Sequence, residues 1–265
     1  MRRNKLREML NADQPTVSTH IHSPWPTVIE AVGHTGLYDY VEWVAEYAPF
    51  DLHDFEHLCR TVELFDMGSM IKIDQEPRTF IAQRAIGSGF QSVLFTDCRT
   101  ADEVRECVRV ARPDTPEDGG TYGAGARRFA HKTFGGSPDY EDYLQALRDI
   151  VVAIMVEKKS AVAQLDEILD LDGVDMIQWG GSDYSMSVGM AGQSVHPDVK
   201  KVEKMVFNKS LNAGKHPRAE IGSPDQAREY LDMGVRHFSI GTDISILYDW
   251  WTNNGDELRK VMEGH

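Results

Sequence analysis

The chain has 265 residues, 41% of them hydrophobic and 26% charged, which is enough for one large domain or two small ones with a sizeable core. Its 28 basic and 42 acidic residues give a formal net charge of −14, which argues against a general surface for nucleic acid or anionic membranes. The sequence contains no apolar run of membrane-spanning length and no signal-peptide pattern, and its three cysteines, an odd number without metal-type spacing, suggest reduced thiols in the cytoplasm.

Short β-rich runs alternate with helical patterns along the chain. Pro26 and Pro77 each open a predicted helix, and Ser223 caps a later one. The predicted strands are 16–22, 39–44, 69–73, 91–96, 150–157, 174–180, 217–222 and 237–241. This alternation predicts an α/β fold with a parallel sheet, and eight strands with seven or eight helices fit a closed (β/α)8 TIM barrel better than an open sheet.

One glycine-rich stretch, residues 113–138, is irregular and contains Arg127 and Arg128. It is too long for a plain loop in a compact domain. We expect a single barrel domain over residues 1–265, with this stretch as an excursion after the fourth barrel helix. The alternative is a lid that faces the substrate.

Two neighbouring predicted strands end in the strongest candidate pair, Glu157 and Asp183. Glu157 closes the apolar run that begins at Ile150, where a carboxylate is costly unless it is paired or bound to metal. Active sites of barrels lie at the C-terminal ends of the strands, and neighbouring strands are about 4.8 Å apart. The two carboxylates could therefore share one hard cation, Mg²⁺ or Mn²⁺. The alternative is that both pair with lysine or arginine.

Several short motifs occur in order along nearly the whole chain. They are EYAPFD from Glu46, VEKKSAV from Val156, GGSDYS from Gly180, NAGK from Asn212 and IGTD from Ile240. Each is weak alone, but the ordered set resembles the HpcH/HpaI class II aldolase family, which is similar to the pyruvate/phosphoenolpyruvate barrel superfamily.

The resemblance implies a metal-dependent carbon–carbon lyase of the aldolase type that acts on a 2-oxo acid through a pyruvate-like enolate. It implies that Glu157 and Asp183 bind the metal and that the N–H groups around Ser182 and Asp183 hold the substrate carboxylate. It also implies a homo-oligomer, since family members form hexamers in which a C-terminal helix packs on a neighbour. The aromatic cluster that starts at Leu247 either makes such a contact or closes the barrel within one chain.

The chain departs from the family pattern at the residues that transfer protons. The family's catalytic histidine is Tyr47 here, and the aspartate that partners it is Val44. The family's arginine aligns with Lys72, which we expect to keep a positive charge beside the 2-oxo group. The alternatives for Lys72 are a Schiff-base nucleophile or an ion pair with Asp74 or Glu76.

His20 shares a strand face with His22 and is a candidate for the missing base, although a hydrogen-bonded structural histidine is the alternative. Tyr47 is a candidate for proton transfer if a cation lowers its pKa; otherwise it packs or hydrogen-bonds. Glu46 is a candidate for ordering metal-bound water.

Arg99 is a candidate clamp for a second substrate carboxylate, and the alternative is a solvated arginine at a helix start. Glu220 is a candidate for binding a cationic or hydroxylated substrate, and the alternative is a salt bridge to Arg218 or Lys215.

Because the base differs from the family's, another enolate reaction stays open: carbon–carbon hydrolysis, decarboxylation, hydration or condensation. A barrel that only binds its ligand is a third hypothesis.

Overall fold

The computed structural model of the chain describes residues 2–125, 128 and 139–264. Eight parallel strands pair in sequence order, and β8 pairs with β1, so the sheet closes into a barrel. The strands are β1 (Thr16–Ile21), β2 (Tyr40–Val44), β3 (Gly68–Ile73), β4 (Ser92–Phe95), β5 (Val151–Val156), β6 (Met176–Trp179), β7 (His216–Ile221) and β8 (His237–Thr242). The predicted (β/α)8 TIM barrel is thus confirmed, with each strand inside or within a residue of its predicted range.

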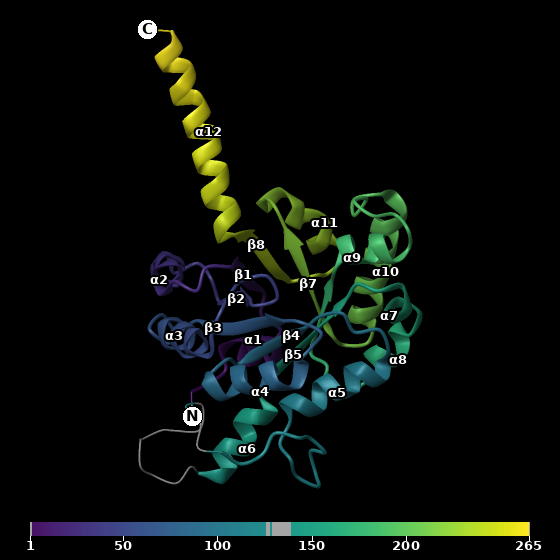
Figure 1. Cartoon of the computed structure of the whole chain (residues 1–265). Coiled ribbons are helices and arrows are strands. Elements are labelled where there is room, and N and C mark those ends of the chain that lie inside the picture. Colours follow the sequence, from purple (N-terminus) through teal and green to yellow (C-terminus); the bar gives the residue numbers. More distant parts are fainter. Residues whose placement is uncertain (1, 126–127, 129–138, 265) are drawn as a thin grey trace.

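Helices surround the barrel (Figure 1). They are α1 (Lys5–Asn11), α2 (Pro26–Thr35), α3 (Leu52–Glu63), α4 (Arg78–Ser88), α5 (Ala101–Ala111), α6 (Tyr140–Arg148), α7 (Lys159–Ala163), α8 (Leu165–Leu169), α9 (Gly181–Ser187), α10 (Pro197–Asn212), α11 (Ala227–Asp232) and α12 (Asp243–Glu263), with a 3-10 turn, η2 (Pro224–Gln226), before α11. Asp51 caps α3 with a capping box, and Gly36 ends α2 at a left-handed φ of 66°.

The interior of the barrel is filled by side chains and closed at one end. Leu6 and Leu10 of α1 belong to the same buried cluster as residues that point inward from the strands. Asn4 holds α1 in place, because its side-chain amide donates to the backbone oxygens of Gln91 and Asp149, both at 2.8 Å. Burial of each leucine stabilises the fold by about 1.5–3 kcal/mol. With the N-terminal end plugged in this way, the C-terminal ends of the strands are left to form the open mouth.

The irregular segment connects α5 to α6, so its ends lie at the N-terminal end of the barrel (Figure 1). Its described part packs there: Arg148 of α6 donates to Asp118 at 2.7 Å, and Arg128 donates to the backbone oxygen of Ser88 at 3.0 Å. These contacts lie at the end of the barrel opposite the strand C-termini. Arg127, Gly135 and Gly136 of the predicted excursion lie outside the described residues.

Helix α12 extends away from the barrel (Figure 1). It carries many exposed apolar side chains, among them Leu247, Tyr248, Trp250 and Trp251. Neither α12 nor any other helix within the described ranges has the length and apolar character needed to cross a membrane.

Candidate active site

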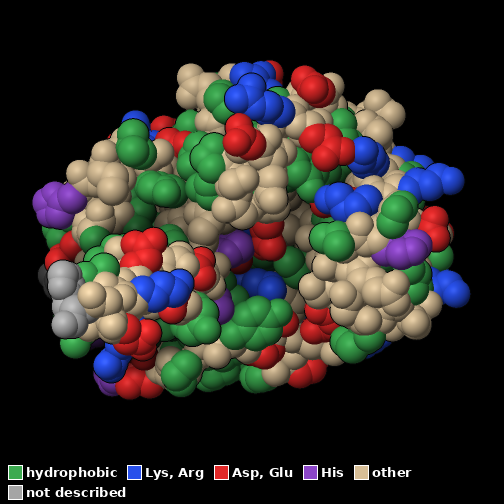
Figure 2. All heavy atoms as spheres, turned by 90° about the horizontal axis from the view of Figure 1, so that it is seen from above, with side chains coloured by type: hydrophobic (Ala, Val, Ile, Leu, Met, Phe, Trp, Pro, Cys, Tyr) green, Lys and Arg blue, Asp and Glu red, His purple; other side chains and the backbone are tan. Residues whose placement is uncertain are grey.

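A cavity of about 290 Å³ opens at the C-terminal mouth of the barrel. Figure 2 looks onto the molecule from this end and shows a hollow with acidic, basic and histidine side chains in its depth. Residues from seven strand ends line it: His20, His22, Glu42, Val44, Tyr47, Lys72, Met155, Glu157, Trp179, Gly180, Gly181, Ser182, Asp183, Glu220 and Thr242. Seven of the nine predicted site residues are therefore brought together, and Glu46 and Arg99 are not part of this lining.

Glu157 follows β5 directly and is almost fully buried, with 4% of its surface exposed. Its Oε1 accepts a hydrogen bond of 2.6 Å from the backbone N–H of Asp97. Burial raises the pKa of Glu157 to about 7, and the nearby charge of Asp183 adds to this rise. A cation between the two carboxylates would remove the cost of keeping Glu157 ionised.

Asp183 lies in the first turn of α9, after the glycine turn that ends β6. Its Oδ1 accepts a hydrogen bond of 2.7 Å from Lys158, which also pairs with Asp97 at 2.5 Å. Asp183 therefore has the lysine partner that the alternative interpretation predicted, whereas Glu157 accepts a hydrogen bond from a backbone N–H group instead. Among the described residues, no donor occupies Glu157 Oε2 or Asp183 Oδ2, so the pair keeps oxygens free for a hard cation.

Lys72 points into the cavity from β3, but its ammonium is already engaged. It lies 2.7 Å from Glu46 Oε2 and donates to the hydroxyl of Tyr47 at 3.2 Å. Burial lowers the pKa of Lys72, but Glu46 outweighs this effect and holds the pKa above its usual range. Lys72 therefore stays positively charged, which argues against a Schiff base. Its ion-pair partner is Glu46 and not Asp74 or Glu76.

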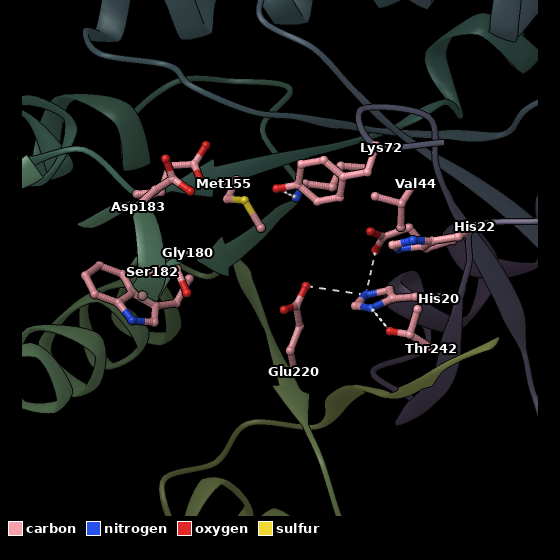
Figure 3. A pocket seen from close by; sticks show the side chains of 15 residues that line it. His20, His22, Val44, Lys72, Met155, Gly180, Ser182, Asp183, Glu220 and Thr242 are labelled. Atoms are coloured by element: carbon pink, nitrogen blue, oxygen red, sulfur yellow. Dashed lines mark hydrogen bonds and ion pairs between the residues drawn. The ribbon is translucent and has the colours of Figure 1, made fainter. Parts of the chain in front are cut away.

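A second polar cluster lies on the side of the cavity formed by β1, β2 and β7 (Figure 3). The Nε2 atom of His20 lies 3.3 Å from Glu220 Oε1 and 3.6 Å from Glu42 Oε2. Burial lowers the pKa of His20, but the two carboxylates outweigh it and raise the pKa to about 9. Ligand atoms of these three side chains lie within 4.8 Å of one another, so in composition the cluster could also hold a metal.

The model of the HpcH/HpaI aldolase/citrate lyase family matches residues 21–249. The chain belongs to this family. It is 27% identical to 2-keto-3-deoxy-L-rhamnonate aldolase from Escherichia coli over 249 residues, 93% of this chain and 90% of the relative.

Solved structures agree with this membership. A HpcH/HpaI aldolase/citrate lyase family protein from Burkholderia cenocepacia superimposes with a TM-score of 0.86 at 28% identity, covering 97% of this chain and all of the other. Protein CitE from Mycobacterium tuberculosis, solved with magnesium and pyruvate, shares the fold at 13% identity and a TM-score of 0.56, covering 86% of this chain and 85% of the other. Family and relatives confirm the prediction of an aldolase-type carbon–carbon lyase acting on a 2-oxo acid.

Within the HpcH/HpaI fold, the side chains of Arg99 and Tyr47 are both exposed. Arg99 is exposed just before the start of α5, and its backbone N–H donates to the Glu103 side chain at 2.8 Å. This position agrees with the alternative of a solvated arginine at a helix start. Tyr47 is 60% exposed. Burial raises the pKa of Tyr47, so its phenol is neutral near physiological pH.

Four buried residues of this HpcH/HpaI site were missed as site residues by the sequence reasoning: Lys158, Glu42, Gln178 and Arg218. Arg218 pairs with Glu42 at 2.5 Å, and both side chains are fully buried. Among the ion pairs of the described residues there is none between Arg218 and Glu220, and Glu220 instead accepts a hydrogen bond from Gln178 and lies beside His20. A signal was present, because two opposite charges inside apolar strands of a closed barrel need partners.

Proposed function

We propose that Glu157 and Asp183 hold a divalent cation, Mg²⁺ or Mn²⁺, and that the chain cleaves or forms the carbon–carbon bond beside a 2-oxo acid through a pyruvate-like enolate. The observation that carries this proposal is the pair of carboxylates at the ends of β5 and β6, each with one oxygen at the cavity that no donor of the described part of the chain occupies. Oxygen ligands of this kind suit Mg²⁺ or Mn²⁺ better than softer metals. When bound, the ion would supply Lewis-acid stabilisation of the charge that develops on the 2-oxo group.

The chain's own residues would bind and orient the substrate around this pair. The backbone N–H groups of Ser182 and Asp183, at the start of α9, would receive the substrate carboxylate. The ammonium of Lys72, which lies 2.7 Å from Glu46 Oε2, would place a permanent positive charge at the C-terminal end of β3, near the 2-oxo oxygen. Glu46 would then act by holding Lys72 and by ordering water.

The remaining candidates would face the part of the substrate beyond the breaking bond. Glu220, His20 and Thr242 present a carboxylate, an imidazole and a hydroxyl on one side of the cavity, which suits a hydroxylated tail. The relative in Escherichia coli is named for a deoxy sugar acid, and a substrate of this class would fit the same preference. Arg99 would contact only a substrate long enough to reach the start of α5, and Tyr47 would donate a hydrogen bond as a neutral phenol.

A coupled assay of pyruvate release from 4-hydroxy-2-oxo acids tests this function. The wild type is expected to need Mg²⁺ or Mn²⁺, and Glu157→Gln is expected to remove both the activity and most of the metal binding. Asp225→Asn, on the exposed turn before α11, is a matched control that should behave as the wild type. Pyruvate release that persists in a chelator would contradict the proposal. Turnover that yields neither pyruvate nor oxaloacetate would favour another enolate reaction on the same site.

We further propose that the chain forms a homo-oligomer through α12, a hexamer if it follows the family. A helix with this many exposed apolar side chains gains stability only when a partner covers them. We also keep the cytoplasm as the proposed location, since all three cysteines are free thiols.

A further inference from the structure

The cluster opposite the carboxylate pair is a continuous chain of four charged side chains. Glu220 lies 3.3 Å from His20, His20 lies 3.6 Å from Glu42, and Glu42 lies 2.5 Å from Arg218. Only Glu220 faces the cavity widely, with 40% of its side chain exposed, whereas 15% of His20 is exposed and Glu42 and Arg218 are fully buried. In Figure 3, Glu220 points from β7 towards the middle of the cavity, and its dashed line leads to His20.

The strand register holds this chain in place. His20 of β1 is the direct partner of Glu42 on β2 and of Thr242 on β8. Gln178 of β6 is the partner of Arg218 on β7, and its side-chain amide hydrogen-bonds both Arg218 and Glu220. Side chains carried by the strands of a closed barrel move little, so the four groups form a rigid array.

The charges of the array balance only when His20 carries a proton. Two carboxylates then face one guanidinium and one imidazolium. The pKa of His20, raised to about 9 by this arrangement, lies close enough to neutral pH for the array to take up and release a single proton. In the same array Glu220 stays ionised, because the hydrogen bond and charge of His20 outweigh the effect of burial and lower its pKa.

The other ionisable groups at the mouth are less suited to proton exchange. Lys72 is held as an ammonium by Glu46, and Tyr47 is held as a neutral phenol, because the pKa of each lies above its ordinary value. Burial lowers the pKa of His22, so the imidazole of His22 is mostly neutral at pH 7. Glu157 and Asp183 are assigned to the cation. The array that ends in Glu220 is therefore the best-placed proton carrier along the described cavity wall.

We propose that Glu220 exchanges a proton with the hydroxyl group of the substrate and that His20 stores this proton, with Glu42 and Arg218 as positioning residues. This inference rests on the proposed lyase function. In cleavage, the hydroxyl proton on C4 passes to Glu220 and on to Nε2 of neutral His20, and the O–H electron pair forms the aldehyde carbonyl. The electrons of the C3–C4 bond move to the 2-oxo group and give the enolate. His20 then returns a proton to water while C3 takes one from water, which restores the array and yields pyruvate.

Two reactions separate the proton relay from the rest of the site. Cleavage of a 4-hydroxy-2-oxo acid requires removal of a hydroxyl proton, whereas decarboxylation of oxaloacetate reaches the same enolate by loss of CO₂ without any such proton. Glu220→Gln is expected to lower kcat/KM for cleavage by about 10²–10⁴ and to leave decarboxylation near the wild-type rate. Glu229→Gln, a 53% exposed carboxylate of α11 that pairs with Lys204 on the surface, should leave both reactions unchanged.

The pH profile tests the stored proton. Cleavage by the wild type should rise with pH towards about 9, because His20 must be neutral to accept the proton. His20→Asn retains an amide that can hydrogen-bond Glu220 but cannot titrate. We expect this variant to be slow in cleavage without the rise towards pH 9, and normal in decarboxylation, which also shows that it folds.

Each outcome is decisive. Equal losses in cleavage and decarboxylation, or no loss in either, in Glu220→Gln would overturn the relay. The relay would also be overturned if the wild type decarboxylates oxaloacetate but cleaves none of a series of 4-hydroxy-2-oxo acids whose hydroxylated tails increase in length. A wild type that does neither refutes the proposed function itself. If bound Mn²⁺ survives Glu157→Gln and is lost in His20→Asn, the cluster is a metal site and the relay is wrong.

Discussion

A methyl group added at Gly180 should displace Glu157 and so weaken the metal site. A Cβ atom built on Gly180 would lie 2.5 Å from Glu157 Cβ and 2.6 Å from Glu157 Oε2. Carbon atoms in contact prefer a separation of about 3.5–4.0 Å, so either the new methyl group or the side chain of Glu157 must move by about 1 Å. Gly180 has a φ of −108°, which alanine tolerates, so the effect of Gly180→Ala comes mainly from the overlap with Glu157, with Met155 Cγ at 3.3 Å as a weaker contact.

The size of the effect follows from this displacement. A misplacement of about 1 Å at a reacting centre can reduce the rate on the order of 10²-fold. Overpacking of a buried position also costs about 1–3 kcal/mol of stability, and each kcal/mol lowers the melting temperature of a chain of this size by about 2–4 °C. We expect Gly180→Ala to bind Mn²⁺ more weakly, to release pyruvate about 10²-fold more slowly and to melt a few degrees lower.

Mn²⁺ titration, pyruvate release and thermal melting are measured on the same preparations. Gly222→Ala is the matched control at the end of β7, because its added Cβ would meet only the side chain of Gln226, at 3.7 Å. If Gly180→Ala bound Mn²⁺ and turned over as well as Gly222→Ala, the close approach of β6 to Glu157 would not set the position of this carboxylate, and the reasoning would fail.

Three further predictions concern stability and assembly. Arg218→Met removes the cation that lies closest to the buried Glu42, so urea unfolding should show a loss of about 3–5 kcal/mol. Much of this loss should return in the double variant Glu42→Gln/Arg218→Met, and a loss no larger than that of an exposed arginine would refute the buried pair. Since the folded-state pKa of His20 is raised from 6.5 to about 9, its contribution to stability is full below pH 6.5 and is lost as the pH rises towards 9. The free energy of unfolding should therefore decline across this range in the wild type and not in His20→Asn. Equal slopes of this free energy against pH in the two proteins would contradict the prediction. Deletion of residues 249–265, which removes most of α12, should lower the mass measured by light scattering while circular dichroism still reports a folded barrel; an unchanged mass would show that α12 does not hold the assembly.

The sequence by itself determined the barrel and the nature of its mouth. Apolar β-rich runs alternating with helices leave few arrangements other than a parallel sheet covered by helices, and eight such units close it. It also placed Glu157 and Asp183 at neighbouring strand ends, because strand order follows chain order in a barrel of this kind. Ser182, Lys72 and Glu220 reached the cavity for the same reason.

Only the tertiary structure decided which charges meet. Glu42 and Arg218 come from opposite ends of the chain and pair inside the barrel through closure of the sheet, so local pattern carries no information on the partner. Lys158 turns to Asp97 and Asp183, and Lys72 turns to Glu46, because ion pairs form between side chains whose ends approach within about 4 Å in space. Helix α1 plugs the barrel for a comparable reason, since Leu6 and Leu10 find a buried surface only after the strands have closed around them.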